Sequence, residues 1–240
     1  MITSLENKTV KELTKLHQKK YRENSFLLLN EDLILKAYYA DKLDKLVYTG
    51  ELPFEFENAI EVSREVLNKI AKKDGLNYIG VGKPIEEKKN YGKRVILLDH
   101  LQDPLNIGRI MLLSALFGFD TVLLSESSAD IYNEKALEAS KGALFDINIC
   151  HGDLVKEIDV LKKQGFKIYS TGLRTYSKEL YEVKENEKMA IVLGNEGSGV
   201  REEIMDISDD IIKIDMHNID SLNVAMAGAI VMHRFKNLVV

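Results

Sequence analysis

The 240-residue sequence has one cysteine, no tryptophan and three prolines. A lone Cys150 cannot form a disulfide within the chain, which excludes a small disulfide-stabilised fold. Glycine (15) and proline (3) are too few for a collagen-like or low-complexity chain. No run of about 18 apolar residues occurs, and residues 1–16 lack the unbroken apolar segment of a secretory signal. We therefore expect a cytoplasmic protein without a membrane partner.

Several catalytic patterns are also missing. The five histidines show no metal-ligand spacing with Cys150 or with one another, so no metal site is expected. No G-x-S-x-G nucleophile elbow occurs, which argues against a serine hydrolase. Cys150 closes an apolar stretch, where a packed thiol is more common than a nucleophile.

Charge is distributed unevenly along the chain. The formal net charge of −5 argues against a histone-like protein, but an average can hide a local basic face. Apolar residues recur at helical spacing from Lys8 to Lys20, which predicts an amphipathic helix with lysines outside. The basic candidates for contact with nucleic-acid phosphates are Lys15, Lys19, Lys20 and Arg22. The alternative is an ordinary solvated helix.

Strands and helices alternate in two blocks. The first block has predicted strands at 26–30, 45–50 and 77–82 and predicted helices at 31–40 and 63–71. Residues 85–94 are charged and lack apolar periodicity, as exposed connections do. We therefore predict a small α/β domain over residues 1–88 and a second domain over residues 94–240.

The second block predicts an α/β domain with a doubly wound parallel sheet. Its strands are expected at 95–100, 121–125, 147–150, 167–171, 189–194 and 210–216. Its helices are expected at 106–117, 134–140, 153–164, 199–207 and 221–236. Nearly continuous apolar strands that alternate with helices are typical of a parallel sheet covered on both faces.

Three loops after these strands are unusual, and ligands in such sheets bind beyond the carboxyl ends of the strands. In LQDPLNIG (101–108), Asn106 can cap the next helix. In GNEGSG (194–199), the glycine spacing fits neither a dinucleotide nor a Walker pattern. Its bare backbone and Glu196 suit a cation better than an anion. Residues 217–233 place Ser221 and Asn223 before a helix with a small-residue face, suited to close packing within the domain or across a dimer interface.

Together, DPLNIG (103–108), IVLGNEGSGV (191–200) and SLNVAMA (221–227) resemble the three motifs of the SpoU-type (TrmH) family of RNA ribose 2′-O-methyltransferases. The similarity extends over residues 94–236. Residues 2–37 also resemble the family's accessory substrate-binding domain, a small fold akin to RNA-binding ribosomal proteins. The resemblance implies a parallel α/β domain with a deep trefoil knot. It further implies S-adenosyl-L-methionine bound between the knot loops, and a homodimer.

The resemblance also assigns residues. The expected cofactor contacts are Gly194, Asn195, Gly197, Ile214, Met216 and Leu222. The expected residues of the reacting centre are Asn106, Arg109, Glu196, Ser221 and Asn223. No metal is implied.

One position departs from the family's pattern. The family has an arginine six residues after the motif asparagine, and this sequence has Leu112 there. Arg109 lies three residues earlier, on the same face of the predicted helix. Arginine stays protonated, so it would clamp a phosphate and lower the pKa of the hydroxyl rather than act as a base. Lys141 and Asp146 also differ from the family's usual residues, which predicts a different RNA path.

The predicted function is S-adenosyl-L-methionine-dependent 2′-O-methylation of a ribose in structured RNA, with ribosomal RNA first and transfer RNA second. One alternative is an RNA- or cofactor-binding protein of the same fold, weakened or inactivated by Leu112. A nucleotide-dependent oxidoreductase is a third class, and the glycine spacing after residue 194 counts against it.

Overall fold

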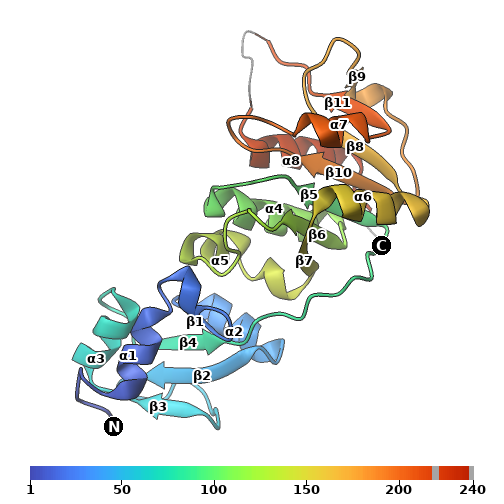
Figure 1. The fold of residues 1–240 in the computed structure, drawn as a ribbon. Coiled ribbons are helices and arrows are strands. Elements are labelled where there is room, and N and C mark those ends of the chain that lie inside the picture. The colour runs from blue at the N-terminus through green and yellow to red at the C-terminus, as the bar shows by residue number, and fades with distance from the viewer. Residues whose placement is uncertain (218–221, 238–240) are drawn as a thin grey trace. The chain divides into compact units, whose positions relative to one another are not determined.

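The computed structural model of the chain describes residues 1–217 and 222–237 (Figure 1). It divides into two compact units. Unit 1 comprises Met1–Glu86 and Asp130–Phe145, and unit 2 comprises Glu87–Ala129 and Asp146–Val240. The chain first passes from unit 1 to unit 2 between Glu86 and Glu87, within the charged connection where a boundary is predicted. The sequence pattern gave no indication that residues 130–145 group with the first unit.

Unit 1 contains a four-stranded sheet in the order β1-β4-β2-β3. Its strands are β1 (Phe26–Leu28), β2 (Leu43–Tyr48), β3 (Ala59–Glu61) and β4 (Tyr78–Gly82). Its helices are α1 (Lys8–Lys15), α2 (Glu31–Tyr39), α3 (Arg64–Ala71) and α5 (Glu134–Ser140), with 3₁₀ turns η1 (Lys19–Tyr21) and η2 (Ala143–Phe145). β4 pairs antiparallel with β1 and β2, and β2 pairs parallel with β3.

The predicted first helix exists, but it is shorter than expected. Asn7 caps α1 by accepting a hydrogen bond from the backbone nitrogen of Thr9 (2.9 Å). Val10 and Leu13 are buried in the same cluster as apolar residues of α3. α1 ends at Lys15, and Lys19 and Lys20 lie on η1 after an extended residue. All three lysines are exposed, although they share no single helix.

Arg22 lies inside unit 1, which corrects its predicted place on an RNA-contacting face. Its side chain is 8% exposed, and Nη1 pairs with Asp130 Oδ2 at 3.2 Å. The guanidinium also donates to the carbonyl oxygens of Tyr132 (2.6 Å) and His17 (3.3 Å). The Tyr132 ring stacks on Phe26 with centroids 4.3 Å apart. These contacts hold residues 130–132 in the first unit, so the charge of Arg22 serves the fold.

Unit 2 contains a seven-stranded sheet in the order β7-β6-β5-β10-β8-β11-β9, and every neighbouring pair is parallel. The strands are β5 (Arg94–Leu98), β6 (Thr121–Ser125), β7 (Asn148–Gly152), β8 (Lys167–Thr171), β9 (Lys178–Glu179), β10 (Met189–Leu193) and β11 (Asp210–Lys213). The helices are α4 (Pro104–Phe117), α6 (Leu154–Lys163), α7 (Glu202–Asp206) and α8 (Val224–Arg234), with 3₁₀ turn η3 (Leu180–Glu182). The predicted parallel α/β sheet is confirmed, and the implied knot stays a prediction.

Helices cover both faces of this sheet, as the continuous apolar strands predict. Residues of α6 and α7 join those of β5, β8 and β10 in one buried cluster. On the other face, α8 approaches closely at Gly228, where an added Cβ would lie 3.0 Å from Leu193 Cδ1. The small-residue face of α8 thus serves close packing within the unit at this point. In the described part of the chain, no helix is long and apolar enough to cross a membrane.

We expect Arg22→Ala to lower the free energy of unfolding by about 3 kcal/mol, because it leaves the buried Asp130 charge without its partner. Urea denaturation followed by circular dichroism measures this change. The neighbouring Lys19 is exposed, and Lys19→Ala should change stability by less than about 0.5 kcal/mol. Equal effects of the two variants would contradict the structural role of Arg22.

Candidate active site

The carboxyl ends of β5, β10, β8 and β11 share one edge of the parallel sheet in unit 2. A cavity of about 350 Å³ lies at this edge. It is lined by the loop that follows β10, residues that follow β8 and β11, and the start of α8. This is the edge where ligands bind in open α/β sheets.

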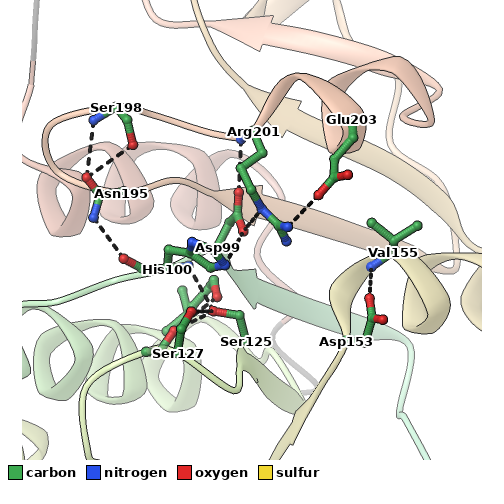
Figure 2. A network of polar contacts seen from close by, with 12 residues as sticks. Asp99, His100, Ser125, Ser127, Asp153, Val155, Asn195, Ser198, Arg201 and Glu203 are labelled. Atoms are coloured by element: carbon green, nitrogen blue, oxygen red, sulfur yellow. Dashed lines mark hydrogen bonds and ion pairs between the residues drawn. The ribbon is translucent and has the colours of Figure 1, made fainter.

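A buried carboxylate joins the loop after β10 to the end of β5 (Figure 2). Asp99 directly follows β5 and is 0% exposed. It accepts hydrogen bonds from the backbone nitrogen (2.9 Å) and the side-chain Nε (2.8 Å) of Arg201. The same guanidinium also pairs with Glu203 at the surface. Since a buried carboxylate without a cation is costly, these bonds fix residue 201 against β5.

Asn195 gives the glycine-rich loop its shape. Its backbone exchanges two hydrogen bonds with Gly199, at 3.0 and 2.9 Å, which closes the loop. Its Oδ1 accepts from the backbone nitrogens of Gly197 (2.9 Å) and Ser198 (3.1 Å). Its Nδ2 donates to the carbonyl oxygen of His100 (2.8 Å), also drawn in Figure 2. The Asn195 side chain therefore holds the loop closed and anchors it beside β5.

Gly194 enters this loop at a point where no side chain fits. An added Cβ would lie 2.1 Å from the backbone nitrogen of Val200 and 2.2 Å from the carbonyl carbon of Gly199. Gly199 itself has a φ of +72°, a conformation that favours glycine. The glycine spacing that fits no nucleotide pattern is thus explained by how tightly this loop turns.

Three predicted residues, Asn106, Glu196 and Asn223, form one continuous chain of hydrogen bonds. Asn223 caps α8 by accepting from the backbone nitrogens of Ala225 (2.9 Å) and Met226 (3.3 Å). Its Nδ2 donates to Asn106 Oδ1 (3.2 Å), and Asn106 Nδ2 donates to Glu196 Oε1 (3.2 Å). Because the helix cap fixes which Asn223 atom accepts, every donor in the chain points toward the carboxylate.

The Glu196 carboxylate carries a negative charge beside the cavity. Burial acts to raise its pKa, but hydrogen bonds from its own backbone, Asn106, Asp103 and Gln102 outweigh burial and lower the pKa below the ordinary 4.5. The backbone nitrogens of Gln102 and Asp103 lie 3.3 and 3.2 Å from its oxygens. Glu196 is therefore ionised at neutral pH.

Of the remaining predicted residues, the cofactor contacts line the cavity, whereas Arg109 does not. All six expected cofactor residues line the cavity: Gly194, Asn195, Gly197, Ile214, Met216 and Leu222. Arg109 is exposed on α4, does not line the cavity, and its side chain bonds to no other described residue. Leu112 is half-buried one turn later on the same helix. Ser221 lies outside the described residues.

Sequence reasoning missed Asp99, Arg201 and Arg174, the last of which lines the cavity and pairs with Glu202. A signal for the first pair was available, because a charged residue at the end of an apolar strand needs a partner. Cys150 fits its predicted role as a packed thiol, since it is 0% exposed and burial raises its pKa to about 12.

Comparisons with known proteins agree on one family. Residues 93–233 match the family model described as the SpoU rRNA methylase family. The 23S rRNA (guanosine(2553)-2′-O)-methyltransferase RlmP of Bacillus subtilis (strain 168) is 30% identical over 245 aligned positions, which cover 98% of each chain.

Two solved structures have the same fold. The AdoMet-bound rRNA methyltransferase from Sinorhizobium meliloti superposes with a TM-score of 0.85 at 24% identity, covering 97% of this chain and 95% of that one. The SpoU methyltransferase AviRb from Streptomyces viridochromogenes, in complex with AdoMet, gives a TM-score of 0.83 at 16% identity over 95% and 96% of the two chains.

Asp99→Asn should release the loop after β10, because the amide cannot form the ion pair with Arg201. We expect a loss of about 2 kcal/mol in unfolding free energy, the scale of a hydrogen bond to a charged group. Amide hydrogen exchange in residues 195–201 should also become faster. Glu203→Gln removes the exposed partner of the same arginine and should leave both measurements unchanged. Unaltered exchange in Asp99→Asn would contradict the anchoring role.

Proposed function

Because this chain belongs to the SpoU rRNA methylase family, we propose that it transfers a methyl group from S-adenosyl-L-methionine to a ribose 2′-hydroxyl of large-subunit ribosomal RNA. The single observation that carries the proposal is the hydrogen-bond chain from Asn223 through Asn106 to the ionised Glu196, beside the cavity. The similarity to RlmP spans both units, which supports ribosomal RNA over transfer RNA as the substrate.

The residues around the cavity suit S-adenosyl-L-methionine. The cavity volume of about 350 Å³ lies within the range of small-ligand sites. Ile212, Ile214 and Leu222 offer apolar contacts for an adenine ring. Bare backbone groups of the glycine loop and the charge of Glu196 suit a sulfonium cation and an amino acid group. When bound, the cofactor supplies an electrophilic methyl group.

The protein's own residues would orient the nucleophile. The exposed Asn223 would meet the attacking ribose oxygen, with its amide orientation fixed by the α8 cap. Asn106 is buried and would hold the Asn223 amide in place. Ser221 belongs to the same proposal through its motif position. Arg109, exposed and without a partner among the described residues, would hold the neighbouring phosphate and ease loss of the hydroxyl proton.

The RNA contacts assigned to unit 1 are Lys15, Lys19 and Lys20. Their side chains are exposed, and the ammonium groups of Lys15 and Lys20 lie 5.5 and 4.9 Å from the centroid of the Tyr21 ring. Two cations beside one exposed ring suit RNA, which offers both phosphates and unstacked bases.

A homodimer completes the proposal. Met226 (59% exposed) and Ile230 (38%) lie one turn apart on α8, and Ile230 shares a cavity of about 500 Å³ with the exposed Tyr181. Exposed apolar side chains grouped in this way are typical of an interface. Sedimentation that gives the mass of one chain would contradict the dimer.

An RNA substrate also agrees with the cytoplasmic location that we infer.

The deciding experiment is transfer of labelled methyl from S-adenosyl-L-methionine to unmodified 23S rRNA, with transfer RNA in parallel and the modified ribose mapped by methylation-sensitive cleavage. We expect incorporation at one ribose of the 23S rRNA.

Asn223→Ala should lower kcat about 100-fold with little change in KM for RNA, because it removes an orienting group. Charge reversal of Lys15, Lys19 and Lys20 should instead raise that KM and flatten its salt dependence. Incorporation into transfer RNA alone would overturn the assigned substrate.

Two further variants separate an active enzyme from an inactivated one. If Arg109 supplies the missing arginine, Arg109→Ala should lower kcat about 100-fold, the scale of a lost charge contact in a transition state. Leu112→Arg should then give little gain. A protein inactivated by Leu112 would show the reverse: no activity in the wild type and a large gain in Leu112→Arg.

A further inference from the structure

Unit 1 carries a cluster of five aromatic side chains from α2, β4 and the loop between β2 and β3. Its members are Tyr38, Tyr39, Phe54, Phe56 and Tyr78. The Tyr38 ring is central, with its centroid 5.2 Å from that of Phe54, 5.4 Å from Tyr39 and 6.0 Å from Phe56. The Phe54 ring in turn meets Tyr78 at 6.4 Å, nearly perpendicular.

This cluster reaches the surface instead of forming a closed core. Tyr38 is 40% exposed although it has three aromatic neighbours, and Tyr39 is 81% exposed. Leu52, in the same loop as Phe54, is 39% exposed. The cluster therefore leaves aromatic surface open to solvent, most of all at Tyr39.

The charge around the cluster is negative. No lysine or arginine occurs between Lys45 and Arg64, whereas Glu51, Glu55 and Glu57 in this interval are all exposed. Burial raises the pKa of Tyr78, and the adjacent Glu31 carboxylate, which accepts its hydroxyl hydrogen bond, raises it further.

Two lysines on the same elements as the rings, or beside them, have other contacts. Lys45 on β2 forms an ion pair with Asp44. The Lys36 side chain lies against Gly142, where it would occupy the space of an added Cβ. Among the described residues, neither forms an ion pair with Glu51, Glu55 or Glu57.

This combination of charge and rings selects one kind of partner. Carboxylates repel RNA phosphates, so the surface does not suit nucleic acid. A guanidinium stacks on aromatic faces and pairs with carboxylates, and it is less strongly hydrated than an ammonium. We propose that the acidic aromatic surface, formed by the five rings with Glu51, Glu55 and Glu57, is a docking site for an arginine-rich segment of another protein. This inference does not rest on the proposed methyl transfer.

The test uses the full chain and a fluorescein-labelled peptide of twelve residues that alternates arginine and serine. Fluorescence anisotropy should show binding that weakens about tenfold or more in Tyr39→Ala, since a tenfold change corresponds to loss of one stacked cation. Glu51→Gln/Glu55→Gln/Glu57→Gln should weaken it at least as much. A matched control, Glu12→Gln/Glu23→Gln/Glu65→Gln, makes the same charge change at exposed sites elsewhere on unit 1 and should leave binding unchanged.

Three results would overturn the proposal. Equal weakening in both triple variants would show attraction to net charge alone. Competition by a single-stranded RNA oligonucleotide that Tyr39→Ala abolishes would identify a nucleic-acid surface. A change in sedimenting mass in Tyr39→Ala would identify a second copy of the chain as the occupant. Because Tyr39 is 81% exposed, its replacement should not unfold the protein, and methyl transfer by this variant reports separately on the proposed function.

Discussion

The buried contact between Asp99 and Arg201 is the constraint on which the site depends. β5 and β10 are neighbours in a parallel sheet, so their following segments leave the same edge. Asp99 fixes the end of the glycine-rich loop, Asn195 bonds to the carbonyl of His100, and Glu196 accepts from the backbone of Gln102 and Asp103. Three links at successive points thus hold one loop against one short segment. The cavity keeps its shape because the loop is held near its start, at residues 195 and 196, and at its end, at residue 201.

Two carboxylates at this edge are given different roles by their surroundings. Asp99 is fully buried and pairs with the Arg201 guanidinium, so its charge stabilises the fold and is not available to a ligand. Glu196 is exposed and held mainly by neutral N–H donors, which keep it ionised without cancelling its charge. Only the second carboxylate can act on a bound cation. The distinction follows from the sheet edge, where one residue closes a buried strand and the other lies in an open loop.

Sequence patterns located the parallel sheet well because its strands are buried on both faces. β6 and β8 have the predicted bounds, and so does α5. β3 and β9 carry no apolar run and were not predicted. The contact between Asp99 and Arg201 does not follow from local sequence patterns because the two residues lie 102 positions apart. Arg22 was misplaced for the same reason, since sequence shows a charge but not the buried carboxylate that receives it.

The location of Arg22 also changes how RNA recognition must work. With Arg22 inside unit 1, the RNA contacts proposed for that unit are Lys15, Lys19 and Lys20, on a chain whose formal net charge is −5. Screening limits electrostatic attraction to about 8 Å at physiological ionic strength, so the whole chain cannot draw RNA from a distance. In the proposed function, recognition would therefore come from local contacts made by these lysines and by Arg109, and from the shape of the RNA. The acidic aromatic surface fits this division, because a face that repels phosphate leaves RNA fewer ways to bind unit 1 in the wrong orientation.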